Sequence, residues 1–552
     1  MPNNFLNTQT KSISSASLIL AISYLTSAIL GLMRDRLLAG TFGAGSELDV
    51  YYAAFTVPDF IALVLVFGAI SAAIIPIFSS YIIKSKEEAW KYVSALFNVF
   101  LGFLIIVCII FIIFAPVIVS LIAPGFSGEK REMTVLLMRI MFLSPIILGA
   151  SNMVSGILQV FHRFLVTALA PIMYNIGIIT GILFFVPRFG LPGLAWGVVL
   201  GGFLHLLIQL PAFFFSGFRY QAIFDVKHPG VSKTIKLMAP RSLGLGAGQL
   251  NTIAITAIGS TLMSGSIAVF NLANNLSSIL VNAVAVSLST AVFPSMSMAF
   301  IQDGEEKFLQ KFSNAFRQTV FLIIPISLLV LILRAQIVRV VLGAGKFDWI
   351  DTRLTTACLG ILAFSLFAQG LIFILSKTFY AAHNTKIPAI VSGLTVAFNI
   401  ILSLLLVWLI KSSVAFSIFL QTLFRLEGVK NMGIVGLALA YSVTAILECF
   451  LLLYLLYKKF PKLKRPKGYP ETSDSLYKIL IASCIMVVFT FLTRQLLVQY
   501  NLISLQTFWE VLLQLVLSGI VGVATYGVAA YLLKSPEIKI IADSFLKRFY
   551  TR

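Results

Sequence analysis

Long apolar segments separated by short polar ones run along almost the whole sequence. Most are at least as long as the roughly 20 residues that an α-helix needs to cross the hydrocarbon core of a bilayer. They lack the period-two alternation of barrel strands, which favours spanning helices over a β-barrel. The pattern predicts about fourteen spans, at residues 14–41, 55–83, 92–123, 133–160, 164–187, 191–216, 232–261, 266–299, 313–334, 355–380, 386–410, 432–457, 476–498 and 508–533.

The composition agrees with a chain that is mostly surrounded by lipid. Of the 552 residues, 59% are hydrophobic and 11% are charged, whereas a soluble domain is about half apolar and a quarter charged. These values exclude a soluble enzyme, a disordered chain and a secreted disulfide scaffold. We therefore expect an all-α polytopic membrane protein. The four cysteines lie singly in apolar runs without CxxC spacing, so neither a metal site nor a disulfide framework is predicted.

The basic residues predict how the chain is oriented. Lys and Arg together number 41 against 21 Asp and Glu, a formal charge of +20. In a membrane protein this excess is typical of cytoplasmic loops beside anionic lipid and does not indicate a nucleic-acid partner. If the N-terminus is cytoplasmic, about 27 of the 41 basic residues fall on the inner side. The distribution therefore predicts that both termini are cytoplasmic.

The sequence repeats itself after about 220 residues. Two ordered sets of landmarks correspond, namely Gly45-Ser46, Pro76 and Glu87-Glu88 in the first copy and Gly265-Ser266, Pro294 and Glu305-Glu306 in the second. The repeat predicts two pseudo-symmetric six-helix lobes, and transporters with parallel repeats bind their substrate between the halves. We expect an N-lobe at residues 1–220, a C-lobe at 221–460, two additional helices at 461–534 and a cytoplasmic amphipathic tail at 535–552.

Ionisable side chains within spans are costly in lipid and usually face a cavity, so they are the first candidates for function. Arg34 and Asp35 lie in the first predicted span, and Asp49 lies just beyond it. Arg241 lies about nine residues into the seventh span and directly follows Pro240, which can loosen the helix and aim a side chain into a cavity. Two interpretations stay open: a charged cavity, or charges that anchor or snorkel at the membrane interface.

Other polar residues within spans give weaker indications. Glu448 and Asn399 are interpreted either as ligands of a coupling ion or as partners in bonds between helices. His205 is interpreted as a packing residue. The sequence contains no phosphate loop, HExxH, GxSxG or carboxylate cluster. We therefore expect no enzyme activity, no catalytic residue, no metal and no cofactor, with transport driven by the membrane potential or an ion gradient.

Several motifs resemble one known family. The segment GLMRDRLLAGTFGAGSELDVYYAAFTVPDF from Gly31, IAPGF at 122–126, GKFD at 345–348 and FYAAHNTKIP at 379–388 occur in the family's order. They are similar to the MurJ/MviN lipid II flippases of the multidrug/oligosaccharidyl-lipid/polysaccharide exporter superfamily. The resemblance implies fourteen spans arranged as two lobes. It also implies that two added C-terminal helices line a hydrophobic groove suited to a lipid tail.

The resemblance also implies a function. Lipid II, the undecaprenyl-pyrophosphate-linked muropeptide, would move from the inner to the outer leaflet of the bacterial cytoplasmic membrane by alternating access, for peptidoglycan biosynthesis and cell shape. Arg34, Asp35 and Asp49 match family positions and would bind substrate, together with Arg241 and Asn275. The expected partners are this lipid and the membrane lipids, and the protein is expected to be a monomer. The alternative is a flippase for another polyprenyl-linked glycan, or a cation-coupled exporter of the same superfamily.

Some positions depart from the family pattern. Ala28, Ala62 and Asn275 stand where other members carry arginine, and Phe67 stands where they carry glutamate. Fewer cations would weaken the binding of a pyrophosphate unless Arg241 replaces part of their charge. The departures concern the identity of the substrate more than the fold.

Overall fold

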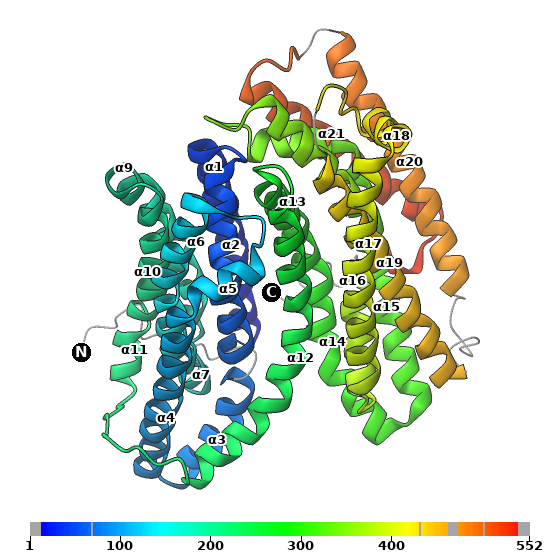
Figure 1. The fold of residues 1–552 in the computed structure, drawn as a ribbon. Helices are drawn as coiled ribbons and strands as arrows, with labels where there is room; N and C mark the ends of the chain where they lie inside the picture. The colour runs from blue at the N-terminus through cyan, green and yellow to red at the C-terminus, as the bar shows by residue number, and fades with distance from the viewer. Residues whose placement is uncertain (1–12, 68–69, 430–431, 462–471, 501–502, 539–552) are drawn as a thin grey trace. The chain divides into compact units, whose positions relative to one another are not determined.

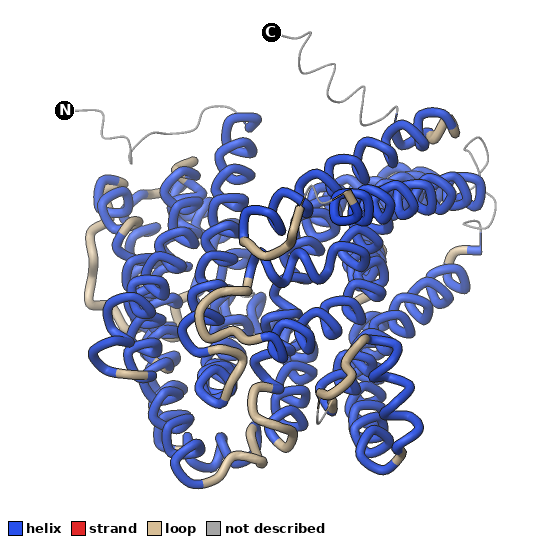
Figure 2. The backbone as a smooth tube through the Cα atoms, turned by 90° about the horizontal axis from the view of Figure 1, so that it is seen from above, coloured by secondary structure: helices blue, strands red, loops and turns tan. Residues whose placement is uncertain are grey.

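The computed structural model describes residues 13–67, 70–429, 432–461, 472–500 and 503–538, and every regular element in these ranges is a helix (Figure 1, Figure 2). In this part of the chain, 13 helical segments are long and apolar enough to cross a membrane. They confirm the all-α polytopic fold. The remaining predicted span, 232–261, coincides with helix α12 (Pro229–Ser260), several of whose side chains lie outside the described residues.

The chain divides into two compact units, residues 1–268 and 269–552. The first unit contains α1 (Ile13–Phe42), α2 (Ser46–Ile61), the π-helical η2 (Ala62–Phe67), α3 (Ile70–Lys84), α4 (Lys86–Ile113), α5 (Ala115–Ile122), α6 (Gly128–Met141), α7 (Leu143–Val160), α8 (Phe164–Thr180), the π-helical η3 (Gly181–Phe185), α9 (Val186–Phe189), α10 (Leu191–Leu207), α11 (Leu210–Phe215) and α12.

The second unit begins at residue 269, within the first turn of α13. It contains α13 (Ser266–Val281), η4 (Asn282–Val286), α14 (Ser287–Met298), η5 (Ala299–Asp303), α15 (Glu305–Val341), α16 (Trp349–Ala381), α17 (Lys386–Ser412), α18 (Val414–Phe424), α19 (Gly433–Lys459), α20 (Thr472–Gln499) and α21 (Phe508–Leu532). Both η4 and η5 are π-helical.

The grouping of α12 differs from the division that the repeat predicts. This helix packs against α2, α3 and η2 and belongs to the first unit, whereas the repeat assigns it to the second lobe. The predicted lobe boundary at residue 220 therefore stays a prediction based on the sequence. The predicted linker at 462–471 and most of the predicted tail, 539–552, lie outside the described residues.

The first residues of the predicted tail, 535–552, are firmly packed at Glu537. Glu537 is buried and accepts hydrogen bonds from the hydroxyls of Ser475 and Ser535. Its carboxylate also lies 4.0 Å from Nε of Arg317. The chain after α21 is thereby fastened to α15 and α20.

Several predicted spans are built from consecutive helices, and two of them are divided beside a proline. The segment 92–123 is divided between α4 and α5 at Phe114, whose backbone leaves the helical conformation just before Pro116. Proline suits the first turn of a new helix because it has no N–H to leave unbonded. The segment 133–160 is divided between α6 and α7 at Phe142, three residues before Pro145. Apolar length alone does not indicate such breaks.

The repeat is visible in local structure. In the first copy α2 passes into the π-helical η2 and then, across the undescribed residues 68–69, into α3, which contains Pro76. In the second copy α13 passes into η4 and then α14, which contains Pro294. The two π-helical segments begin at Ala62 and Asn282, the same offset that relates the sequence landmarks. Because π-helix is rare, a matching interruption supports duplication over chance similarity.

Glycines allow α8 and α10 to pack backbone against backbone. A Cβ atom built on Gly177 would lie 2.3 Å from Cα of Gly201, and one built on Gly181 would lie 2.5 Å from Cα of Gly197. Gly177 and Gly181, like Gly197 and Gly201, are four residues apart and so share a helix face. Small residues at this spacing are a typical contact between membrane helices, where packing replaces the hydrophobic effect.

We predict that Gly197→Ala lowers the free energy of unfolding by about 1–3 kcal/mol, because its Cβ would lie 2.7 Å from Cα of Gly181. Gly393→Ala is the matched control, since no atom lies within 4 Å of its built Cβ. This control should be neutral or slightly stabilising, as alanine favours helix more than glycine does. Thermal unfolding of the purified variants in detergent measures both effects. Equal unfolding temperatures would show that the close contact is dispensable.

Candidate functional site

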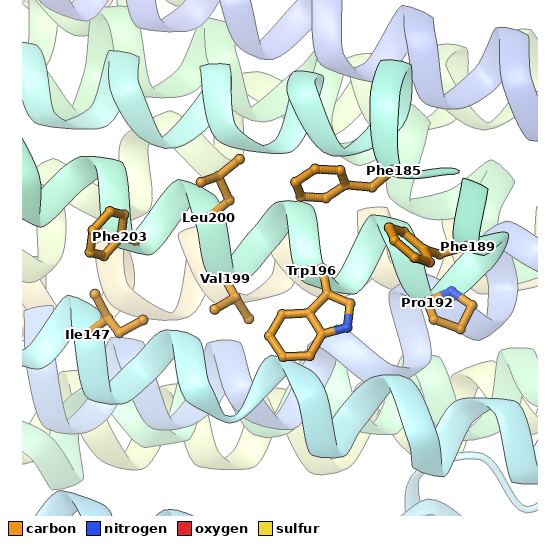
Figure 3. A pocket seen from close by; sticks show the side chains of 8 residues that line it. All are labelled: Ile147, Phe185, Phe189, Pro192, Trp196, Val199, Leu200 and Phe203. Carbon is orange, nitrogen blue, oxygen red and sulfur yellow. The ribbon is translucent and has the colours of Figure 1, made fainter. Parts of the chain in front are cut away.

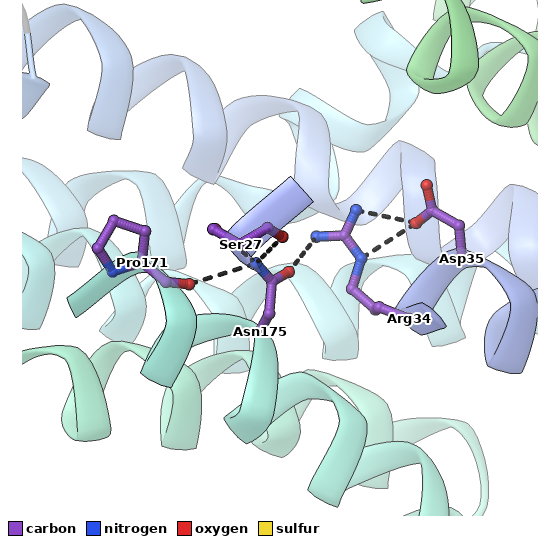
Figure 4. Close-up of polar contacts among 5 residues, drawn as sticks. All are labelled: Ser27, Arg34, Asp35, Pro171 and Asn175. Atoms are coloured by element: carbon purple, nitrogen blue, oxygen red, sulfur yellow. Dashed lines mark hydrogen bonds and ion pairs between the residues drawn. The ribbon is translucent and has the colours of Figure 1, made fainter. Parts of the chain in front are cut away.

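The best-defined charged group in the first unit is Arg34 of α1. Its Nε and Nη2 donate to Oδ1 of Asp35 at 3.0 and 2.8 Å, and its Nη1 donates to Oδ1 of Asn175 at 3.2 Å (Figure 4). The side chain of Asp35 is 3% exposed, and that of Arg34 is 23% exposed. The buried carboxylate therefore balances the arginine charge while part of the guanidinium stays accessible.

Asn175 of α8 holds the arginine in place. Its amide nitrogen donates to the carbonyl of Pro171 at 3.2 Å and to the carbonyl and hydroxyl of Ser27 at 3.3 and 3.2 Å (Figure 4). The amide oxygen is thereby turned toward Arg34. A guanidinium has five N–H donors, and the described contacts of Arg34 use three of them. One N–H on each Nη remains for a ligand.

Arg34 lines a cavity of about 280 Å³ inside the first unit. The lining also includes Asp59 and Ala62 from α2 and η2, Tyr174 from α8 and His205 from α10. Oδ2 of Asp59 accepts a hydrogen bond from Gln249 of α12 at 3.5 Å. The cavity thus combines a cation with hydrogen-bonding groups, which is the chemistry needed to hold a polar or anionic group within the membrane.

His205 is packed as expected but also reaches the cavity. It is buried, and its Nδ1 lies 2.6 Å from the hydroxyl of Ser151. Gln209 donates to the same hydroxyl at 2.8 Å and accepts from Ser155 at 2.6 Å. These contacts form a polar chain from α7 to His205 of α10 and to Gln209, the N-cap of α11, and the chain reaches the cavity wall at His205. Its hydrogen bonds confirm the packing interpretation of His205.

Asp49 lies in a different environment, and its carboxylate supports the local fold. Its Oδ2 accepts from the backbone N–H of Gly265 at 2.7 Å and from Nζ of Lys130 at 3.2 Å, and its Oδ1 accepts from the N–H of Ala268 at 3.0 Å. The bonded amides lie at the start of α13, where an acidic side chain is favoured. Its predicted part in substrate binding stays a prediction.

The second unit contains the other predicted polar residues. Glu448 of α19 accepts hydrogen bonds from the hydroxyls of Ser392 at 2.6 Å and Thr395 at 3.3 Å, both on α17. Asn399, one turn after Thr395, is buried and accepts from Ser403 at 3.5 Å. The carboxylate and these hydroxyls form an oxygen-rich cluster between α17 and α19. Oxygen ligands of this kind suit a proton or a hard cation.

For Asn275 and Arg241, the two remaining predicted site residues, the structure gives burial or backbone position only. Asn275 is half-buried on α13. Arg241 lies within α12, directly after Pro240, but its side chain lies outside the described residues. The proposal that Arg241 and Arg34 act together therefore stays a prediction.

A separate pocket on the first unit is almost entirely apolar. It has a volume of about 680 Å³, and five of its eight lining residues belong to α10 (Figure 3). Trp196, Phe189 and Phe203 in its wall are 45–62% exposed. No charged side chain lines it, so it is suited to hydrocarbon and not to a pyrophosphate.

Comparison with known proteins places the chain in a family. A family profile described as "Lipid II flippase MurJ" matches residues 38–415. A protein of Buchnera aphidicola subsp. Schizaphis graminum, named "Probable lipid II flippase MurJ", is 30% identical over 79% of this chain and 82% of its own length. The chain belongs to the lipid II flippase MurJ family. The lipid II flippase MurJ of Burkholderia cenocepacia is 28% identical over 66% of this chain and 72% of its own.

Solved structures agree with membership of the MurJ family. A structure described as "Lipid II flippase MurJ, inward closed conformation" has a TM-score of 0.72 and 26% identity, covering 94% of this chain and 99% of that one. An inward-facing multidrug resistance MATE family transporter has a TM-score of 0.63 over 81% of this chain and all of its own. At 16% identity the second likeness concerns the fold alone.

Sequence reasoning missed the partners of its own candidates. Asn175 is 141 positions from Arg34, and Lys130 is 81 positions from Asp49. Contacts over such separations depend on which helices are neighbours, and one sequence does not contain that information. A local signal existed for Asn175, because it is a polar residue one turn after Pro171 in an otherwise apolar span.

We predict that Asp49→Ala lowers the free energy of unfolding by about 3 kcal/mol, because it leaves two backbone N–H groups and Lys130 without their acceptor. Glu47→Ala is the control, since Glu47 is exposed in the same first turn of α2. Thermal unfolding in detergent and the yield of folded protein measure the difference. If both variants unfold at the wild-type temperature, the carboxylate does not support the fold.

Proposed function

We propose that this protein is a lipid II flippase of the bacterial cytoplasmic membrane. It would carry the undecaprenyl-pyrophosphate-linked muropeptide from the inner to the outer leaflet for peptidoglycan biosynthesis. Membership of the MurJ family supports the substrate class. The observation that carries the proposal is Arg34, fixed at the wall of a cavity by Asp35 and Asn175.

The chemistry of Arg34 suits a pyrophosphate. The two N–H groups left free by its described contacts lie on different terminal nitrogens of one planar guanidinium, so they can bind two oxygens of one phosphate. Before a ligand binds, the carboxylate of Asp35 neutralises the Arg34 charge and so lowers the cost of placing it inside the protein. When an anionic ligand binds, it would share the guanidinium with Asp35.

Transport would follow an alternating-access cycle. The head group would bind at the cationic cavity while the polyprenyl tail stays in lipid beside α20 and α21. Both termini would be cytoplasmic, and the protein would act as a monomer without enzyme activity or a cofactor. The membrane potential or an ion gradient would return the protein to its starting state, with the Glu448 cluster as the ion site.

A second candidate is a flippase for another polyprenyl-linked glycan, or a cation-coupled exporter. The observation that favours it is Ala62, which lines the same cavity as Arg34 at a position where the family resemblance expects arginine. The cavity wall is therefore less basic than a pyrophosphate site of the family pattern. Transport assays with defined lipids separate the two functions.

We predict that the wild-type chain rescues bacteria depleted of their own lipid II flippase. Arg34→Ala should weaken transport roughly ten- to hundredfold, because it removes charge-assisted hydrogen bonds of about 1.5–3 kcal/mol. Arg241→Ala should weaken it as well. Arg188→Ala, which removes an exposed arginine from α9, is the control. Failure of a well-inserted wild type would favour another polyprenyl-linked substrate, and full rescue by Arg34→Ala would refute the cavity's role.

We predict that Glu448→Gln abolishes the ion dependence of transport and leaves substrate binding intact, because the amide keeps the shape of the side chain but not its charge. Flipping of fluorescent lipid II in proteoliposomes, with sodium or proton gradients of either direction, measures this dependence. Glu306→Gln changes an exposed carboxylate in the first turn of α15 and serves as the control. An unchanged response of Glu448→Gln to both gradients would exclude the cluster as the coupling site.

A further inference from the structure

Three arginines gather at one end of the second unit. Arg334 belongs to α15, Arg494 belongs to α20, and Arg425 is the C-terminal cap of α18. Nη1 of Arg494 donates to the carbonyl of Ile332 at 2.8 Å, two residues before Arg334 on α15. The charges of Arg334 and Arg494 are both opposed by that of Arg425. All three guanidinium groups therefore share one electrostatic environment.

Arg334 is the central member of this arginine cluster. It lies seven residues before the end of α15, which places it about 10 Å inside the helix end. The side chain lies flat over α16 at Gly360, where a built Cβ would lie 2.5 Å from Nη1 and 2.8 Å from Cδ of Arg334. Glycine at position 360 is therefore what makes room for the guanidinium. The side chain is half-buried.

The cluster has no carboxylate to balance it in the part of the chain that the structure describes. No hydrogen bond or ion pair of Arg334 is seen there, and Arg494 donates only to the carbonyl of Ile332, at 2.8 Å. Neighbouring acids are occupied elsewhere. Glu427 lies 3.9 Å from Arg353, and Glu510 accepts from Ser504 and from the backbone N–H groups that precede α21.

The position of Arg425 is maintained by the backbone around it. Arg353 of α16 donates to the carbonyl of Arg425 and, at 3.1 Å, to that of Glu427. Arg425 itself has a left-handed backbone with a φ of 57°. Its side chain is exposed. The loop after α18 thus adds the Arg425 charge to those of Arg334 and Arg494.

Like charges gathered near the ends of membrane-spanning helices favour a bound anion, because their repulsion is poorly screened where water is scarce. We propose that Arg334, Arg425 and Arg494 bind the phosphate of an anionic membrane lipid. Phosphate matches the fork geometry of arginine. A lipid can reach the site from the side, because Phe491 and Leu492 on α20 are 44% and 45% exposed, and the ring of Phe491 lies 5.0 Å from the guanidinium carbon of Arg494.

This lipid-phosphate site is independent of the transported substrate, since any phosphate-bearing anionic lipid at that depth satisfies the cluster. A bound lipid would also connect the arginines of α15, α20 and the loop after α18, whose charges repel one another.

Native mass spectrometry of the purified full chain, supplied with equal amounts of phosphatidylglycerol and phosphatidylcholine, tests the proposal. We expect the wild type to retain phosphatidylglycerol preferentially. Arg334→Gln and Arg494→Gln should each reduce this retention about tenfold. Arg425→Gln, an exposed change that leaves the packing intact, should reduce it several-fold. Lys411→Gln removes an exposed cation from the end of α17 and should retain the lipid as the wild type does.

Three results would overturn the proposal. One is equal retention of the two lipids by the wild type. Another is unchanged retention in the Arg425→Gln variant together with unchanged retention in Arg334→Gln or Arg494→Gln. The third is displacement of phosphatidylglycerol by an equal concentration of inorganic phosphate, which would assign the arginine cluster to a free anion. Failure here leaves the flippase proposal standing, because the complementation assay does not use this site.

Discussion

Lipid cannot form hydrogen bonds, and this single constraint governs most of what the chain does. Backbone groups must bond within their own segment, so every described element is a helix. The same constraint applies to the side chains that break the apolar pattern. Asp35 is buried beside Arg34, and Glu448 is held by two hydroxyls. Between such contacts the helices are joined by close packing, as at the glycines of α8 and α10.

Charged groups in this protein differ in how many of their hydrogen-bonding positions are used by neighbouring residues. That difference distinguishes residues that stabilise the fold from residues that can bind a ligand. Asp49 accepts from three donors and has little capacity left for a ligand. Arg34 is restrained by Asp35 and Asn175 but keeps two donors. Arg334 faces other arginines without a described acceptor. A cation with some N–H groups bonded and others free is held in place and can still bind an anion. Reversible binding of an anion within a membrane requires both conditions.

The helices and the repeat could be predicted because both depend on the order of residues along the chain and not on contacts between distant residues. Apolar length indicated the spans, and ordered landmarks such as Pro76 and Pro294 indicated the duplication. The partners of the charged residues could not be predicted, because Asn175 and Lys130 are distant in sequence from the groups they bind. Arg34 and Asp35 were identified from their cost in lipid alone. The arginine cluster was missed because its members lie near helix ends, where single arginines are common.

The π-helical segments η2 and η4 have a consequence for the helices that contain them. A π-helical turn accommodates one residue more than an α-helical turn, and each residue of an α-helix turns the chain by about 100°. Because α14 directly follows η4, its residues present a different face from the one that an uninterrupted helix would present. Removing one residue from η4 would restore regular helix and rotate α14, which contains Pro294. The duplication thus copied a π-helical interruption along with the fold, and with it a change in the direction of the side chains that follow.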